Sequence, residues 1–246
     1  MDLNIRGKVV LISGANANLG RALALAFGDE GARLALCTQS DRAGMAETQR
    51  LAESRGAKTV TGLLDIADPN AVRDFVGRVE AELGSVDILV NNAVRRAETD
   101  SLTAHDDHRR AYDTAVTGPL NLCAATLPEM KRQGWGRILT FAGIGAFLGH
   151  GSVRAATKMA TVGLTRSLAA ELGPDGITVN CIAPGVMDTA RSRPLSEACL
   201  RDEARRAIPR RGRTDEIAAT AVFLSSVQAG YITGQCIHVN GGSYYA

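Results

Sequence analysis

The feature of this sequence that most constrains its fold is a regular alternation of short aliphatic runs with longer Ala- and Leu-rich stretches of helical pattern. Strands that are apolar throughout are typical of parallel sheets covered by helices on both faces. The alternation therefore predicts an α/β fold, a doubly wound sheet of seven mostly parallel strands with helices on both sides. The expected strands are Val9–Ser13, Arg33–Cys37, Thr59–Leu64, Ile88–Asn91, Arg137–Phe141, Thr178–Ile182 and Cys236–Val239.

No linker-like, low-complexity or repeated segment interrupts this alternation, so we expect a single domain over residues 1–246. The least regular stretch follows the sixth expected strand. Residues 186–209 are predicted to form a lid there, because ligands of such sheets bind beyond the carboxyl ends of the strands.

The segment Met1–Lys8 lacks the apolar core of a signal peptide, and no apolar run approaches the ~20 residues of a membrane span. We therefore expect a cytoplasmic protein.

The charge balance argues against nucleic acids and anionic membranes as partners. The 246 residues carry 28 Lys and Arg against 26 Asp and Glu, and a net charge of +2 with both signs interspersed gives no basic patch for nucleic acid or an anionic membrane. The five cysteines are widely spaced and form no CxxC pair. Their mostly apolar surroundings favour buried, reduced thiols, and we expect no metal site.

A glycine-containing turn from Ser13 to Gly20 follows the first expected strand and opens a helix rich in Ala and Leu. Glycines at such a turn let the backbone approach a pyrophosphate, which the helix N-terminus then holds. The strand before the turn and the helix after it supply the context that a dinucleotide-binding motif requires. The turn is therefore a candidate dinucleotide site.

The whole chain resembles the short-chain dehydrogenase/reductase family, whose motifs occur in order between residues 7 and 242. The resemblance implies a Rossmann-type fold, an NAD(P) cofactor and tetrameric assembly. The matching segments are Ser13–Gly20 for TGxxxGxG, Asp65 for the adenine-contacting aspartate, Asn91–Ala93 for NNAG, Pro184-Gly185 with Thr189 for PGxxxT, and Tyr231–Gln235 with Val239–Gly242 for the C-terminal signature.

The catalytic positions depart from the family pattern. In the resembling family a Tyr shuttles a proton while hydride moves to or from nicotinamide, a Lys lowers the pKa of that Tyr, a Ser holds the substrate oxygen, and an Asn anchors a water relay. This sequence keeps the lysine as Lys158 but has Arg154 for the Tyr, Gly143 for the Ser and Ala115 for the Asn. Arginine cannot be deprotonated at working pH, so Arg154 cannot act as a base. We expect an inactive site in which Lys158 is vestigial.

No replacement set of catalytic side chains is visible in the sequence. Asn121 lies six positions after Ala115, about 240° round an ideal helix, and should point elsewhere. His150 has the intrinsic pKa of a base, but a lone loop histidine is more often solvated. Tyr112, Thr140 and Ser152 are the other polar residues near the expected site.

The cofactor contacts also depart from the family pattern. Asn18 replaces the second glycine of the turn and Val94 that of NNAG, and each adds a side chain next to the dinucleotide. Thr38 and Gln39 stand where the family carries the residues that select NAD or NADP. We therefore expect weak or absent NAD(P) binding. The residues that the resemblance places at the cofactor are Gly14, Asn16, Asn18, Leu19, Gly20, Asp65, Ile66, Asn92, Ala93 and Thr189.

Three functions remain open. The favoured one is a non-catalytic subunit that supports an active homologous NAD(P)-dependent alcohol or hydroxyacyl-CoA dehydrogenase in a heterotetramer, an arrangement similar to that of heteromeric (hydroxyphenylmethyl)succinyl-CoA dehydrogenases. In the resembling family, helices equivalent to residues 105–131 and 154–171 form a subunit interface. The second function is an anion- or acyl-CoA-binding regulatory module. Its cationic residues would be Arg95, Arg96, Arg154, Lys158, Arg191 and Arg193. The third function is an atypical oxidoreductase or non-redox enzyme that uses Lys158 or His150.

Overall fold

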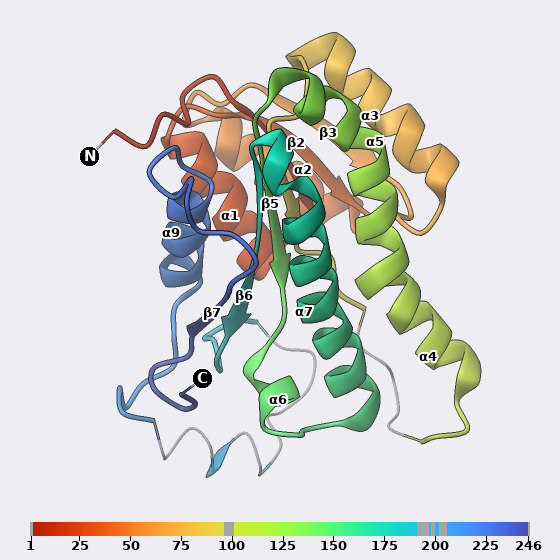
Figure 1. Ribbon diagram of the computed structural model, residues 1–246, viewed down its shortest axis with the longest axis vertical. Helices are drawn as coiled ribbons and strands as arrows, with labels where there is room; N and C mark the ends of the chain where they lie inside the picture. The colour runs from red at the N-terminus through yellow and green to blue at the C-terminus, as the bar shows by residue number, and fades with distance from the viewer. Residues whose placement is uncertain (1, 96–100, 191–196, 198–199, 202–205, 246) are drawn as a thin grey trace.

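The chain is built around one seven-stranded sheet in the order β3-β2-β1-β4-β5-β6-β7 (Figure 1). The computed structural model describes residues 2–95, 101–190, 197, 200–201 and 206–245. All six strand pairings are parallel, which confirms the predicted doubly wound sheet. The strands are β1 Val9–Ser13, β2 Arg33–Thr38, β3 Thr59–Leu63, β4 Ile88–Asn91, β5 Gly136–Phe141, β6 Ile177–Pro184 and β7 Cys236–Val239.

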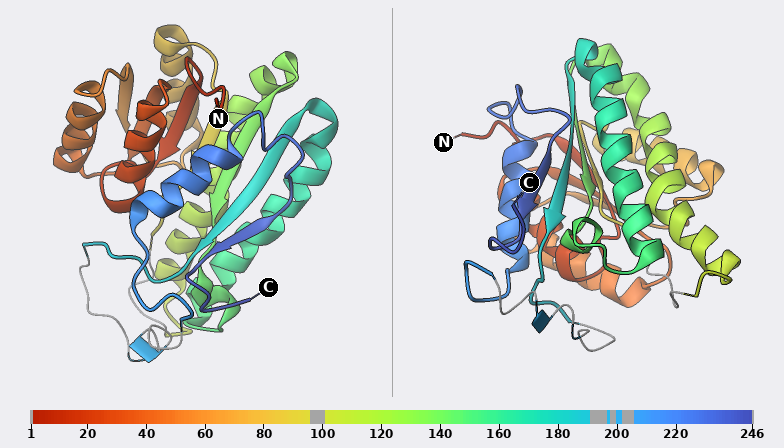
Figure 2. Two further views of the ribbon diagram at one scale, coloured as in Figure 1. Left: turned by 90° about the vertical axis from the view of Figure 1, so that its left-hand side faces the viewer. Right: turned by 60° about the horizontal axis from the view of Figure 1, so that its bottom comes forward.

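Helices cover both faces of the sheet. On one face α1 contacts α2 and α9, and on the other α3 contacts α5, with α7 packed against β5 and β6 (Figures 1 and 2). Their bounds are α1 Asn18–Asp29, α2 Arg42–Glu53, α3 Pro69–Leu83, α4 His105–Tyr112, a π-helical turn Asp113–Thr117, α5 Gly118–Gln133, α6 Ile144–Phe147, α7 Ser152–Leu172, a 3₁₀ turn Gly173–Asp175 and α9 Thr214–Leu224.

Strand β1 shows why the expected strands are apolar throughout. Successive side chains of a strand point to opposite faces of the sheet. Val10 and Ile12 join the core on the side of α1 and α9, whereas Val9 and Leu11 join the core on the side of α3 and α5. Because both faces are covered, all four side chains are fully buried, and each contributes about 1.5–3 kcal/mol of transfer free energy to folding.

Local sequence signals set the starts of two helices. The carboxylate of Asp41 accepts a hydrogen bond from the backbone N–H of Gly44 at 2.9 Å and so caps α2. Asp68 caps α3 in the same way through the N–H of Asn70 at 2.9 Å, and Pro69 occupies the first helical position, where no backbone donor is needed.

The strand order indicates the end of the sheet at which a ligand is expected to bind. The chain runs outward from β1 in one direction to β3 and from β4 in the other to β7. Ligands of such sheets bind beyond the carboxyl ends of the strands, where this order reverses.

Of the predicted lid, residues 191–196, 198–199 and 202–205 lie outside the described residues, so the lid stays a prediction. None of the described helices combines the length and the hydropathy that crossing a bilayer demands.

Candidate functional site

The turn between β1 and α1 has the close packing that its two glycines allow. Gly14 has a φ of +69°, and a Cβ there would lie 2.8 Å from the Cα of Ala93. A Cβ on Gly20 would lie 2.0 Å from the carbonyl oxygen of Gly14. Both positions therefore require glycine. The N-cap residue of α1, Ala17, makes no side-chain cap hydrogen bond to the first turn of that helix.

The end of β4 braces this turn. The Asn92 side-chain amide donates to the carbonyl oxygens of Ser13 and Gly14 at 3.1 and 3.0 Å. In return, the Ser13 hydroxyl accepts from the backbone N–H groups of Asn92 and Ala93, both at 3.1 Å. These contacts and the close packing of Gly20 against Gly14 bring together four of the residues predicted at the cofactor, Gly14, Gly20, Asn92 and Ala93.

The ends of β2 and β3 form a polar rim next to the turn. The Asn16 amide donates to Asp41 at 2.7 Å and accepts from the Thr38 hydroxyl at 3.1 Å. The Gln39 amide donates to Asp65 at 2.9 Å. The two positions that select NAD or NADP in the resembling family, Thr38 and Gln39, are therefore hydrogen-bonded to other predicted cofactor residues.

Asn18 joins the turn to the segment after β6. Its φ is +47°, in the left-handed region that Asn tolerates better than most residues. Its side-chain oxygen accepts from the backbone N–H of Ala190 at 3.1 Å, next to the half-buried Thr189. Leu19 packs against the core. The sequence identified Asn18 as a departure from the family pattern but gave no signal for its contact with Ala190.

The four catalytic positions lie around β5, α7 and the π-helical turn. Lys158 is half-buried in α7, and its Nζ donates to the carbonyl oxygen of Phe141 at 2.6 Å. Arg154 is exposed in the first turn of the same helix. Gly143 follows β5 in an extended conformation, and a Cβ there would meet no heavy atom of the described residues within 4 Å. A Cβ at Gly143 therefore meets no steric obstacle among the described residues.

Ala115 lies in the π-helical turn between α4 and α5. The backbone N–H of Gly118 donates to the carbonyl of Asp113, five residues earlier. Pro119 has no N–H, so it cannot make the helical bond to the carbonyl of Ala115, four residues before it. A Cβ on Gly118 would lie 2.4 Å from Cδ1 of Ile66, so this turn packs tightly against the segment after β3. The Gly-Pro pair was the available signal for this feature, which the sequence analysis missed.

Two of the residues considered as stand-ins have other partners. The Asn121 amide donates to the carbonyl of Ile66 at 2.9 Å, which agrees with the prediction that it points away from Ala115. The buried Thr140 hydroxyl lies 2.7 Å from that of Thr165. Tyr112 is 47% exposed at the end of α4.

The remaining sequence candidates lie on the segments around β5 and α7 and after β4. His150 is half-buried, and its backbone N–H donates to Gly145 at 2.8 Å. Ser152 is exposed at the start of α7. In the proposed cationic set, Arg95 is half-buried, whereas Arg96, Arg191 and Arg193 lie outside the described residues. The convergence of these arginines therefore stays a prediction.

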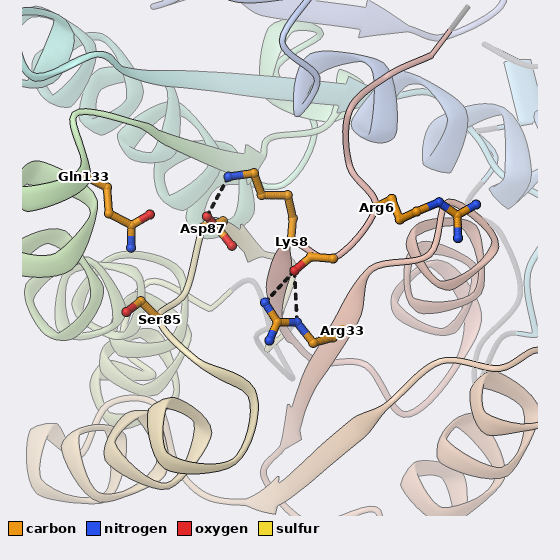
Figure 3. Close-up of a pocket in the computed structure, with 7 residues that line it drawn as sticks. Arg6, Lys8, Arg33, Ser85, Asp87 and Gln133 are labelled. Carbon is orange, nitrogen blue, oxygen red and sulfur yellow. Dashed lines mark hydrogen bonds and ion pairs between the residues drawn. The ribbon is translucent and has the colours of Figure 1, made fainter.

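A hollow of about 370 Å³ lies at the opposite, amino-terminal end of the strands, and Figure 3 shows the residues that line it. Several of its polar groups bind one another. Lys8 forms an ion pair with Asp87 at 2.9 Å, Asp87 also accepts from the backbone N–H of Val9 at 2.8 Å, and Arg33 donates to the carbonyl of Gly7 at 2.9 Å. These contacts brace the first residues of β1 and β2, so we assign them a structural role.

Comparison with known proteins identifies the family. A family model described as enoyl-(acyl carrier protein) reductase matches residues 14–244. The 3-oxoacyl-[acyl-carrier-protein] reductase FabG of Escherichia coli K12 is 33% identical over 98% of this chain and 99% of its own length, and that of Staphylococcus aureus Mu50 is 34% identical over 96% and 98%.

Solved structures agree with this match. L-sorbose reductase from Gluconobacter frateurii, complexed with NADPH and L-sorbose, superimposes with a TM-score of 0.90 at 29% identity over the full length of both chains. A blue fluorescent protein from a metagenomic library, in complex with NADPH, has a TM-score of 0.90 at 30% identity and covers 98% of this chain and 100% of its own. The chain therefore belongs to the short-chain dehydrogenase/reductase family, as a homologue of the FabG-type reductases.

Proposed function

We propose that this chain is a non-catalytic, cytoplasmic subunit of the short-chain dehydrogenase/reductase fold. It supports an active homologous subunit, an NAD(P)-dependent alcohol or hydroxyacyl-CoA dehydrogenase. The observation that carries the proposal is Arg154, which stands where the family has its proton-transferring Tyr, one helical turn before Lys158. A guanidinium keeps its proton at working pH and so cannot act as the base. Gly143 and Ala115 supply no hydroxyl or amide in the two other catalytic positions.

The cofactor cradle supports retained but weakened NAD(P) binding. The residues that would hold the pyrophosphate are Gly14, Gly20 and the first turn of α1, and Gly14 and Gly20 keep the close backbone approach that such a turn needs. When bound, a dinucleotide would supply or accept the hydride. Asn18 and Val94 are the misfits, because each adds a side chain to this cradle, and that of Asn18 is bound to Ala190. Two structurally similar proteins hold NADPH, which supports the same class of ligand here.

Exposed apolar residues support assembly with a partner. On α5, Leu120 is 42% exposed, and on α7, Met159 is 44% exposed. A Cβ on Gly163, one turn after Met159, would meet no heavy atom of the described residues within 4 Å. Small and apolar residues on neighbouring exposed helices are typical of protein interfaces. We propose that this face contacts the same helices of an active subunit in a heterotetramer.

The first experiment measures turnover by the purified chain. The substrates are 3-oxoacyl thioesters with NADPH or NADH, and secondary alcohols or hydroxyacyl-CoA esters with NAD or NADP. The expected rate is no higher than that of the Lys158→Ala variant, because the base is missing. Turnover that Lys158→Ala abolishes would overturn the proposal.

The second experiment addresses the partner. The chain is co-expressed with family members from the same organism, and native mass spectrometry then determines the mass of each complex. A mixed tetramer whose dehydrogenase activity exceeds that of the partner alone is expected. A homo-oligomer that never takes up a partner would contradict the heterotetramer. Replacing Met159 by Glu, on the proposed interface, should weaken the complex, whereas Glu at the exposed Phe223 of α9 is the matched control.

An active reductase is the second candidate function, because the whole chain aligns with FabG-type reductases and Lys158 is kept. The turnover assay decides between these two candidates. A regulatory module for acyl-CoA is tested by thermal shift with CoA esters, since a ligand raises stability by RT ln(1 + [L]/Kd). No shift at millimolar ester would argue against that module.

A further inference from the structure

Two cysteines that occupy no catalytic position of the family lie side by side on the last two strands of the sheet. Cys181 of β6 and Cys236 of β7 are direct register partners in the parallel pairing of these strands. Both contact the same small apolar cluster, which includes Ala142 and Val162, so both side chains lie on the face of the sheet that α7 covers. Figure 2 shows β7 running beside β6 at the edge of the sheet.

The surroundings of this pair favour a thiolate on Cys181. The pKa of Cys181 is lowered, chiefly because the Cys236 S–H donates to its sulfur, and further by the Thr140 hydroxyl and the charge of Lys158. The same contact raises the pKa of Cys236, together with burial, against a lowering by Arg166. Of the two sulfurs, Cys181 is therefore the one whose pKa is lowered and Cys236 the one whose pKa is raised.

The other described cysteines differ. Cys37 and Cys123 are fully buried, and burial raises the pKa of each thiol to about 12. Such thiols are inert, because the thiolate is the nucleophile. The contrast within one chain makes Cys37 and Cys123 internal controls for the reactivity of the pair.

The pair has a route from solvent. A pocket of about 600 Å³ lies between α7 and β7, and Cys236 is part of its wall. Phe147 and His238 form an aromatic side of this pocket, with ring centroids 4.6 Å apart, and Arg166 adds a positive charge. Cys236 is half-buried, whereas Cys181 lies fully buried behind it. A small uncharged oxidant in the pocket therefore has to pass the Cys236 side chain to reach the sulfur of Cys181.

We propose that Cys181 and Cys236 form a reactive dithiol, which hydrogen peroxide converts into a disulfide between β6 and β7. The Cys181 thiolate attacks one peroxide oxygen, the O–O bond breaks, and a sulfenic acid and hydroxide form. The Cys236 sulfur then attacks the sulfenic sulfur, the S–O bond breaks, and water leaves with the Cys236 proton. The two sulfurs are oxidised and the peroxide is reduced, so atoms and electrons balance.

As register partners, Cys181 and Cys236 have the general spacing of neighbouring strands. That spacing is about 4.7–4.9 Å, and disulfides span Cα separations of about 4.4–6.8 Å. Such a pair in an intracellular protein is typical of a transient, redox-responsive disulfide rather than a permanent one. The inference does not depend on the catalytic state of the site, because neither cysteine stands at a catalytic position of the family.

The test uses the full chain in a Cys199→Ser background, which leaves four of the five cysteines. The reduced protein is treated with hydrogen peroxide, denatured and alkylated with N-ethylmaleimide, and its peptides are analysed by mass spectrometry. The expected result is a peptide pair linked between Cys181 and Cys236, with Cys37 and Cys123 alkylated. A sample reduced again with dithiothreitol should regain alkylation at all four.

Single variants separate the two roles. In Cys236→Ser, peroxide should leave a sulfenic acid on Cys181 that dimedone traps, because the resolving thiol is gone. In Cys181→Ser, Cys236 loses the partner that chiefly raises its pKa, but burial still raises that pKa, so its reaction with peroxide should be slower than that of the intact pair. The proposal is overturned if no linked peptide forms, if Cys37 and Cys123 react as fast as the pair, or if Cys236 oxidises equally fast in Cys181→Ser.

Discussion

Replacing Lys158 by Met tests what this lysine does in a site without the family tyrosine. The Nζ of Lys158 donates to the carbonyl of the buried Phe141 at 2.6 Å, and this bond ties α7 to the end of β5. A hydrogen bond from a charged group contributes about 1.5–3 kcal/mol. Against this, the like charge of Arg154 one turn earlier costs about 0.2–0.5 kcal/mol, which Met removes.

The expected net loss of unfolding free energy in Lys158→Met is therefore about 1–3 kcal/mol, since Met retains most of the apolar stem. For a domain of this size each kcal/mol lowers Tm by about 2–4 °C. Urea and thermal unfolding followed by circular dichroism measure both quantities. Arg154→Met is the matched control on the same helix, because Arg154 is exposed, and it should change stability by less than about 0.5 kcal/mol. Equal losses in the two variants, or no loss in Lys158→Met, would refute a structural role for Lys158.

Three further predictions concern other parts of the chain. Asp87→Ala should cost about 1–3 kcal/mol in urea unfolding, because it leaves the buried N–H of Val9 without its acceptor, whereas Asp87→Asn keeps an acceptor and should cost less. Gly143→Ser should change Tm within experimental error, since its Cβ enters open space. The pKa of Glu216 should lie at about 2 in an NMR titration, because Arg210 binds its carboxylate. The folded-state pKa is depressed, so this contribution to stability is complete above the ordinary value of 4.5 and is lost as pH falls towards 2.

Most of the sheet could be predicted from the sequence, because strands that are buried on both faces consist of continuous runs of apolar residues. The predicted and observed bounds are the same for Val9–Ser13, Ile88–Asn91 and Cys236–Val239. Strand β6 extends past its prediction to Pro184, since its end pairs with Val239 of β7. Such an extension depends on the neighbouring strand, which a local pattern does not contain.

The proximity of the motif residues could be predicted, but their contacts could not. Gly14 and Asn92 each follow directly on a strand whose carboxyl end lies at the same edge, and Gly20 lies in the first turn of the helix that follows Gly14. The contact of Asn18 with Ala190 joins residues 172 positions apart. The pairing of Cys181 with Cys236 depends equally on tertiary register. Contacts of this kind are decided by how β6 and β7 pack against the rest of the chain, so single-sequence patterns cannot contain them.

The catalytic departures fall where the fold tolerates both the family residue and its replacement. Gly143 has room for a serine side chain, and Arg154 is exposed, so a tyrosine there needs no rearrangement of the core. The variant Gly143→Ser with Arg154→Tyr should therefore fold, and any remaining lack of activity must arise elsewhere. If adding Asn18→Gly then strengthens NADPH binding in a thermal-shift titration but turnover still fails, the remaining differences from the family are Ala115 at the catalytic positions and Val94 at the cofactor. If the first two changes alone give turnover and Asn18→Gly leaves NADPH binding unchanged, the argument for weak binding from Asn18 is wrong.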